Sequence, residues 1–157
     1  MSRPPVAPDL DQATRRALAV GLFNYTWTLL ENPNRNPEQD DEMLHAAHAS
    51  RYHWGEVGEK VNVARGEWQV SRVYAVLGRG EPALYHARRC VEINEANAEG
   101  REDWDLGSAY EAMARAHAVR GDRAASDEWK ARAVDQLATI ADAEDRQVLE
   151  QDIATLP

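Results

Sequence analysis

The 157-residue chain has little of several features that would point to particular classes of protein. Its one cysteine, Cys90, cannot form a disulfide within the chain. No apolar run is long enough to cross a membrane, and the opening stretch MSRPPVAPDL is polar and proline-rich, unlike a signal peptide. The formal net charge of −9 lacks the basic excess that nucleic-acid binding requires. These absences predict a soluble cytoplasmic protein that binds neither nucleic acid nor membrane.

Motifs that carry known chemistry are also missing. The sequence has no Gly-rich phosphate loop, no nucleophile elbow and no metalloprotease helix motif. Cys90 lies near Ala87, Val91 and Asn94 on one helical face, which predicts a buried thiol rather than a nucleophile. The sequence therefore predicts no cofactor, and it favours a noncatalytic role while leaving catalysis open.

What the chain does have is the composition of an all-α protein. Apolar residues make up 43% of it, and the abundance of alanine and arginine over β-branched residues favours helix. A single phenylalanine accompanies five tryptophans and five tyrosines, so most aromatic side chains carry a polar atom that needs a partner when buried. A chain of this length fits one domain with a substantial core.

Break and cap signals predict about seven helices that follow a flexible tail at residues 1–8. Asp9 or Asp11 can cap the first helix. Two Asn-Pro steps then break the chain, and Asn36 and Pro37 can open the second helix. The predicted units of the single domain at 9–157 are a divergent helix pair at 9–58, repeat-like pairs at 59–97 and 103–140, and a capping helix at 143–155.

Apolar spacing predicts which helix faces are buried. The third helix, from about Glu59 to Leu77, is apolar on two faces, so we expect it at the centre of the fold with Trp68 in the core. The expected core stripe of the first helix is Leu18, Leu22, Tyr25 and Leu29.

Two helical segments share one pattern of residues. The first is Tyr74, Gly78, Ala83, Cys90 and Val91, and the second is His117, Gly121, Ser126, Ala133 and Val134. This pattern resembles the tetratricopeptide repeat, with an aromatic residue before a turn glycine and small residues where the second helix packs. Ser126 replaces the usual alanine, Glu95 stands where a proline often ends the repeat, and the glycines are 43 residues apart instead of about 34. The alternative is an ordinary antiparallel helix bundle, which is also all-α.

The resemblance implies a stack of helix pairs that binds a protein, a peptide or a small molecule, as a monomer or a homodimer. In such a stack the first helix of each pair lines a groove. The polar stripe expected to face this groove or solvent is Asn62, Arg65, Gln69 and Arg72, with Glu111 and Arg115 on the fifth helix.

The stretch from Met43 to Trp54 concentrates unusual chemistry, because it holds three of the five histidines. His45, His48 and Tyr52 share one helical face, and we expect both imidazoles to face the interior of the stack. Buried imidazoles need hydrogen-bond partners. The predicted ligand-binding residues are His45, His48, Tyr52, Glu67, Arg72, Tyr74 and Asp105.

The same stretch leaves two other readings open. A histidine, a phenol and nearby acids are the parts of general acid–base catalysis, so a small enzyme is the alternative function. His45 and His48 could also chelate a metal with His86 or Asp105. Only one Glu-x-x-His motif, Glu42 with His45, is present, which argues against a di-iron site. Hydrogen bonding is the commoner use of such histidines, so no metal is predicted.

Overall fold

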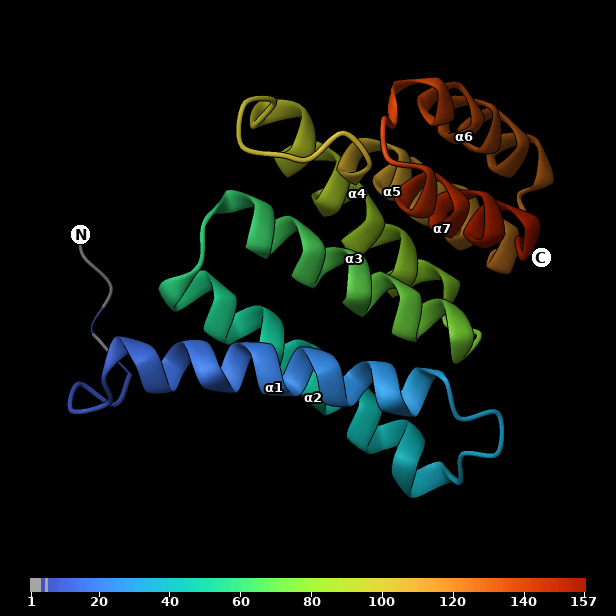
Figure 1. Ribbon diagram of the computed structural model, residues 1–157. Coiled ribbons are helices and arrows are strands. Elements are labelled where there is room, and N and C mark those ends of the chain that lie inside the picture. Colours follow the sequence, from blue (N-terminus) through green and yellow to red (C-terminus); the bar gives the residue numbers. More distant parts are fainter. Residues whose placement is uncertain (1–3, 5) are drawn as a thin grey trace.

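The computed structural model describes residue 4 and residues 6–157, and this part of the chain has an all-α fold (Figure 1). The described residues contain seven α-helices, one 3-10 helix and no strand. The helices are α1 (Gln12–Leu30), α2 (Pro37–Val57), α3 (Lys60–Val76), α4 (Gly80–Ala96), α5 (Asp105–Val119), α6 (Arg123–Gln136), η1 (Leu137–Thr139) and α7 (Ala143–Ala154). The all-α fold predicted from the composition is confirmed.

The ends of several helices follow from the local sequence. The carboxylate of Asp11 accepts from the amide of Thr14 at 2.7 Å and so caps α1. Asn36 and Gln39 form a capping box at the start of α2. Gly78 and Gly121 adopt φ values of 73° and 83°, a region that favours glycine. These observations confirm the predicted caps and the two glycine turns.

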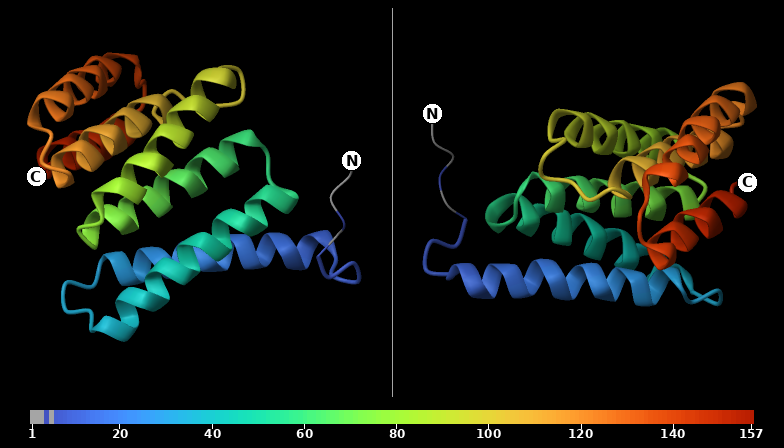
Figure 2. Two further views of the ribbon diagram at one scale, coloured as in Figure 1. Left: turned by 180° about the vertical axis from the view of Figure 1, so that it is seen from behind. Right: turned by 45° about the horizontal axis from the view of Figure 1, so that its top comes forward.

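Consecutive helices pack against each other as the pairs α1/α2, α3/α4 and α5/α6. Helix α3 also contacts α1 and α5, so these three helices form one layer, with α2, α4 and α6 behind it (Figures 1 and 2). Helix α3 therefore has the central position predicted for it. Helix α7 packs on α5 and α6 and lies on the side of the α1, α3 and α5 layer.

A serine hydroxyl joins the two helices of every pair. In each case it donates to a main-chain carbonyl of the partner helix. The bonds are Ser50 to Ala19, Ser71 to Ala83 and Ser126 to Ala114, each at 2.8 Å. The last two bonds occupy equivalent positions in the two repeat-like pairs, because Ser71 and Ala114 are 43 residues apart, as are Ala83 and Ser126. The donor is on the first helix in one pair and on the second helix in the other. The close approach that small residues permit is thus repeated in all three pairs.

Two predicted core positions differ from the structure. Leu18 and Tyr25 on α1 are 40% and 39% exposed, whereas Ala19, Thr26 and Leu29 are buried. Helix α1 ends the stack, and it approaches α2 through its small residues, which leaves the larger side chains outside. Trp68 packs against the core with part of its ring uncovered.

The predicted tail at residues 1–8 is only partly visible, because residues 1–3 and 5 lie outside the described residues. The Arg15 guanidinium donates to the carbonyls of Val6, at 2.6 Å, and Ala7. None of the helices in the described residues is both long enough and apolar enough to cross a membrane.

Candidate functional site

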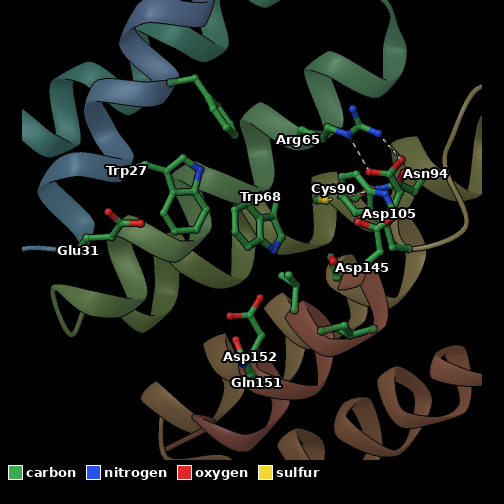
Figure 3. Close-up of a pocket in the computed structure, with 15 residues that line it drawn as sticks. Trp27, Glu31, Arg65, Trp68, Cys90, Asn94, Asp105, Asp145, Gln151 and Asp152 are labelled. Atoms are coloured by element: carbon green, nitrogen blue, oxygen red, sulfur yellow. Dashed lines mark hydrogen bonds and ion pairs between the residues drawn. The ribbon is translucent and has the colours of Figure 1, made fainter. Parts of the chain in front are cut away.

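A pocket of about 520 Å³ lies between α1, α3, α5 and α7 (Figure 3). Three of the five tryptophans line it: Trp27 from α1, Trp68 from α3 and Trp104 at the start of α5. We call it the tryptophan pocket. The rings of Trp27 and Trp68 have centroids 5.5 Å apart and are tilted by 37°. The pocket therefore lies on the layer formed by the first helices of the pairs, where the sequence predicted a groove.

One wall of the tryptophan pocket is an ion pair between α3 and α5. The Arg65 guanidinium donates two hydrogen bonds of 2.9 Å to the carboxylate of Asp105, and it lies 4.4 Å from the ring centroid of Trp104. Asp105 is buried and also accepts from the amide of Glu102 at 2.8 Å. Bidentate pairing fixes the direction of both side chains, so this wall is rigid.

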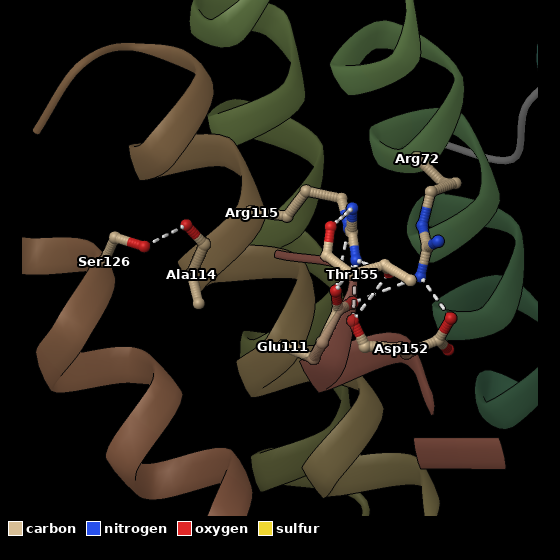
Figure 4. Close-up of polar contacts among 7 residues, drawn as sticks. All are labelled: Arg72, Glu111, Ala114, Arg115, Ser126, Asp152 and Thr155. Atoms are coloured by element: carbon tan, nitrogen blue, oxygen red, sulfur yellow. Dashed lines mark hydrogen bonds and ion pairs between the residues drawn. The ribbon is translucent and has the colours of Figure 1, made fainter. Parts of the chain in front are cut away.

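Helix α7 forms the opposite wall, and buried charges hold it (Figure 4). Glu111 is fully buried and accepts from Arg115 at 2.7 Å. Arg115 also donates to the Asp152 carbonyl at 2.8 Å, and Arg72 pairs with the Asp152 carboxylate at 3.1 Å. Burial raises the pKa of Glu111, while the charges of Arg72 and Arg115 oppose that rise. Because these bonds join α3, α5 and α7, the wall is part of the fold.

The polar stripe expected to face the groove is therefore placed differently. Gln69 is fully buried and donates to the carbonyl of Phe23 at 3.0 Å, while Glu111 and Arg115 are buried in the contact with α7. The sequence expectation for these three residues is wrong, because α7 and α1 cover the helix faces that the stripe occupies. Arg65 lines the tryptophan pocket as expected, and Arg72 lies at its edge over the Trp68 ring, 5.2 Å from the centroid.

Two buried polar atoms of the tryptophan pocket have no hydrogen-bond partner among the described residues. They are the Nε1 of Trp68 and the Oδ1 of Asn94. Asn94 is only 3% exposed, and its amide nitrogen donates to the carbonyl of Cys90 at 3.0 Å, which orients the amide. An unpaired buried polar atom costs free energy, so both atoms are places where a bound molecule could supply the missing bond.

A second polar group lies between α2, α3 and α4, and we call it the histidine cluster: Arg51, His48, Glu67, Tyr74 and His86. The Nε2 of His48 and the hydroxyl of Tyr74 are 2.9 Å apart. The Glu67 carboxylate accepts from Arg51 at 2.8 Å and lies 2.6 Å from the Nδ1 of His86. The rings of Tyr74 and His86 stack with centroids 5.7 Å apart. The polar side chains of this cluster therefore form their hydrogen bonds with one another.

The environment also determines the charge within the histidine cluster. Burial lowers the pKa of His48, and the neighbouring His86 lowers it further. For Glu67, burial alone would raise the pKa, but hydrogen bonds from His86 and Arg51 outweigh it and hold the pKa below its usual value. The cluster therefore favours a neutral imidazole at His48 and an ionised carboxylate at Glu67.

The predicted site residues fall into three places. His48, Glu67 and Tyr74 come together in the histidine cluster. Asp105 instead lines the tryptophan pocket, and Arg72 lies at its edge, paired with Asp152. These two groups are on different faces of α3, because residues 65, 68 and 72 follow one helical stripe and residues 67 and 74 follow another.

The remaining two predicted residues, His45 and Tyr52, are exposed, and Tyr52 contacts the ring of His53. The expectation that His45 faces the interior is wrong. The buried face of α2 runs through Met43, Ala46 and Ala47, and His45 lies beside this face. Among the described residues, no group of three or more His, Cys, Asp or Glu side chains is arranged to hold a metal ion.

Sequence reasoning missed most of the tryptophan pocket. Trp27, Asn94 and Trp104 come from three separate helices or loops, and α7 supplies Asp145 and Asp152. The available signal was the unusual ratio of tryptophan to phenylalanine, since an indole offers both a flat apolar ring and a donor. That signal does not tell which tryptophans come together.

No model of a known protein family matches this chain, and no curated protein matches it either. The geometry of the tryptophan pocket and of the histidine cluster is therefore the basis for assigning a function.

Proposed function

We propose that this protein is a noncatalytic, tetratricopeptide-like binding module whose ligand enters the tryptophan pocket. The repeat-like packing supports the first part of this proposal. Gly78 and Gly121 both have positive φ, and the following amides bond back to Tyr74 and His117 at 2.8 and 2.9 Å. The same turn therefore closes two successive helix pairs, in line with the shared sequence pattern.

The observation that carries the proposal is the tryptophan pocket itself. At about 520 Å³ it has the size of pockets that take small ligands, about 300–1,000 Å³. It combines three indole rings with a few polar groups, among them the unpaired atoms of Trp68 and Asn94. Apolar walls with a few directed polar atoms are typical of a ligand site, because the rings supply contact area and the polar atoms supply selectivity.

The alternative function is a small enzyme that uses His48 and its neighbours. The bonds of the histidine cluster favour a structural role instead. His48 is bonded to Tyr74, and both oxygens of Glu67 are bonded to Arg51 and His86. A catalytic base must reach a substrate proton, and here the polar atoms face one another across three helices.

The five tryptophans allow a direct test by NMR of the indole N–H signals, with assignments from single Trp→Phe variants. A fragment library that contains cationic, neutral and anionic compounds is added to the protein. We expect binders to shift the signals of Trp27, Trp68 and Trp104. Trp54 packs beneath Arg16, and Trp129 packs against Tyr110, so both serve as internal controls.

Two variants sharpen the test. Trp68→Leu should abolish the shifts at Trp27 and Trp104, whereas Trp129→Leu, outside the pocket, should preserve them. If no compound in the library shifts any pocket indole, or if shifts occur only at Trp54 and Trp129, the proposed function is wrong.

A further inference from the structure

We infer that the tryptophan pocket selects a small organic cation, a protonated amine whose apolar body also carries an oxygen acceptor. The inference rests on the proposed function, because it identifies the ligand class for that pocket. It follows from three features of the pocket: its unpaired carboxylates, its two unpaired buried polar atoms and its size.

The charges of the tryptophan pocket do not balance. Four acidic residues line it: Glu31, Asp105, Asp145 and Asp152. Asp105 is paired with Arg65, and Asp152 with Arg72. Among the described residues, the carboxylates of Glu31 and Asp145 have neither a hydrogen bond nor an ion pair. Within the described part of the chain, the one basic residue in the lining is Arg65, which is already paired with Asp105, so the pocket presents excess negative charge to a ligand.

The orientation of Asn94 adds an acceptor to this negative potential. Its Nδ2 is committed to the carbonyl of Cys90 at 3.0 Å, so the unpaired atom is the oxygen. A buried amide oxygen that accepts no hydrogen bond favours a ligand with an N–H or O–H donor at that position. A primary or secondary ammonium group supplies such donors together with its charge, which a quaternary ammonium or an anion cannot do.

Trp68 presents the opposite requirement. Its indole Nε1–H is unpaired, and Figure 3 shows the nitrogen directed toward α7 and Asp152. Because an indole nitrogen only donates, the ligand needs an acceptor oxygen in addition to its ammonium group. The indole rings also suit such a ligand, since their flat apolar faces can contact its body and attract its cationic group. In this pocket Arg65 and Arg72 already lie over Trp104 and Trp68.

The size of the pocket favours a free small molecule. A volume of about 520 Å³ accommodates one such ligand. Helix α7, tied to the stack through Arg72 and Arg115, closes one side of the pocket. The ammonium group would lie near Asn94 and the unpaired carboxylate of Asp145, which are on the same side of the pocket in Figure 3, and the apolar body would lie against the packed rings of Trp27 and Trp68.

Four matched probes test the charge and the acceptor. Tyramine carries both the ammonium group and an oxygen, and phenethylamine lacks the oxygen. Tyrosol and 4-hydroxyphenylacetate replace the ammonium group with a neutral and an anionic group. Titrations followed by the indole N–H signals should give the order tyramine, then phenethylamine, then tyrosol, with 4-hydroxyphenylacetate weakest.

The unpaired carboxylates provide the matched variants. Glu31→Gln with Asp145→Asn should weaken tyramine binding by about tenfold at low salt and leave tyrosol binding unchanged, because only the charge is removed. Asp127→Asn with Glu128→Gln removes the same charges from the exposed surface of α6 and should leave tyramine binding unchanged.

The outcomes separate this inference from the proposed function. If tyrosol or 4-hydroxyphenylacetate binds as tightly as tyramine, or if the Glu31/Asp145 variant binds tyramine like the wild type, the ligand class is wrong and the pocket remains a binding site. If none of the four probes binds while other library compounds do, the ligand class is again wrong. Only the absence of any binder at the pocket indoles overturns both.

Discussion

The tryptophan pocket and the histidine cluster lie on different faces of α3, and they use polar groups in opposite ways. In the histidine cluster, Glu67 has two partners and His48 has one, so the charges and hydrogen bonds are satisfied internally. In the tryptophan pocket, Asn94 and Trp68 keep unpaired buried atoms, and two carboxylates have no partner among the described residues.

The difference shows where to look for function in such a fold. A satisfied polar network stabilises the packing between helices, and its members have little capacity left for a ligand. Buried polar atoms without a hydrogen bond lower the stability of the fold, and a protein tends to keep them where they bind a ligand. The first kind of region here contains only His48 from the histidine-rich stretch, joined by His86 from α4, and the second is lined by three tryptophans that are far apart in the sequence.

The largest effect should follow from breaking the histidine cluster. Glu67 is 5% exposed and joins Arg51 on α2 to His86 on α4, so Glu67→Ala leaves both partners without a counter-ion. We expect a loss of about 2–3 kcal/mol in the free energy of unfolding, below the value for fully buried pairs because Arg51 can reach water. Urea denaturation measures this loss.

The control for Glu67 is Glu92, whose ion pair with Arg89 is solvent-exposed. Glu92→Ala should cost well under 1 kcal/mol, since exposed ion pairs contribute little. If the two substitutions have equal effects, the histidine cluster is not the structural network described above.

Trp68→Leu should lower the free energy of unfolding by less than Glu67→Ala does, but it should abolish ligand binding. Truncating a tryptophan that is enclosed in the core to alanine lowers the free energy of unfolding by about 3–5 kcal/mol. The central position of α3 would predict a loss of this size for Trp68→Ala. Because one side of Trp68 borders the tryptophan pocket and leucine retains part of the contact, we expect about 1–2 kcal/mol. A melting experiment with a parallel ligand titration checks both quantities. A variant that unfolds would show that Trp68 is mainly a core residue.

The pH dependence of stability distinguishes the two regions further. Burial lowers the pKa of His48 and of His117 from the usual 6.5. The unfolded chain therefore binds these protons at higher pH than the folded chain. Stability is then complete above about pH 6.5 and falls as the pH decreases below it. Glu67, whose pKa is also lowered, adds a loss of the same sign at more acidic pH.

Thermal melts between about pH 8 and pH 5.5 measure this dependence. His48→Gln should flatten the decrease, because one of the two responsible imidazoles is gone. His45→Gln should flatten it much less, because the charge of His45 is only a minor cause of the lowered pKa of His48, after burial and His86. An unchanged slope for His48→Gln would mean that its imidazole is not desolvated.

The fold was largely predictable because its signals are local. Asn36 and Pro37 determine where α2 begins, and Gly78 and Gly121 determine two turns, each through atoms a few residues away. Burial on α1 was less predictable. Leu18 and Ala19 are neighbours, and which of them is buried depends on how closely α2 approaches, which is a tertiary property.

The site was predicted only in part, for the same physical reason. Asp105 and Arg72 were identified as site residues, but the sequence grouped them with the histidines of α2. Nothing in a single sequence shows that α7 turns back over α5 to bring Asp145 and Asp152 opposite Trp68. The packing of consecutive helices followed from the helix-pair pattern, whereas the position of α7 beside the pocket did not.

The smallest effect on stability should come from the unpaired carboxylates of the tryptophan pocket. Glu31 is the C-cap of α1, where the helix dipole disfavours a negative charge, and Asp145 lies in the first turn of α7, where it favours one. Each effect is about 0.5 kcal/mol and the signs are opposite. Glu31→Gln should therefore stabilise the fold slightly, Asp145→Asn should destabilise it slightly, and the double variant should match the wild type.

Because the two substitutions change stability in opposite directions, their effects on stability and on ligand binding can be distinguished. Both single substitutions remove one negative charge from the pocket, so both should weaken the binding of a cation, although they change stability in opposite directions. Urea denaturation and tyramine titration of the two single variants test this. If binding instead followed stability, with Glu31→Gln binding better than the wild type, the carboxylates would act through the packing of the helices and not through their charge. The contrast between a satisfied cluster and an unsatisfied pocket would then lose its functional meaning.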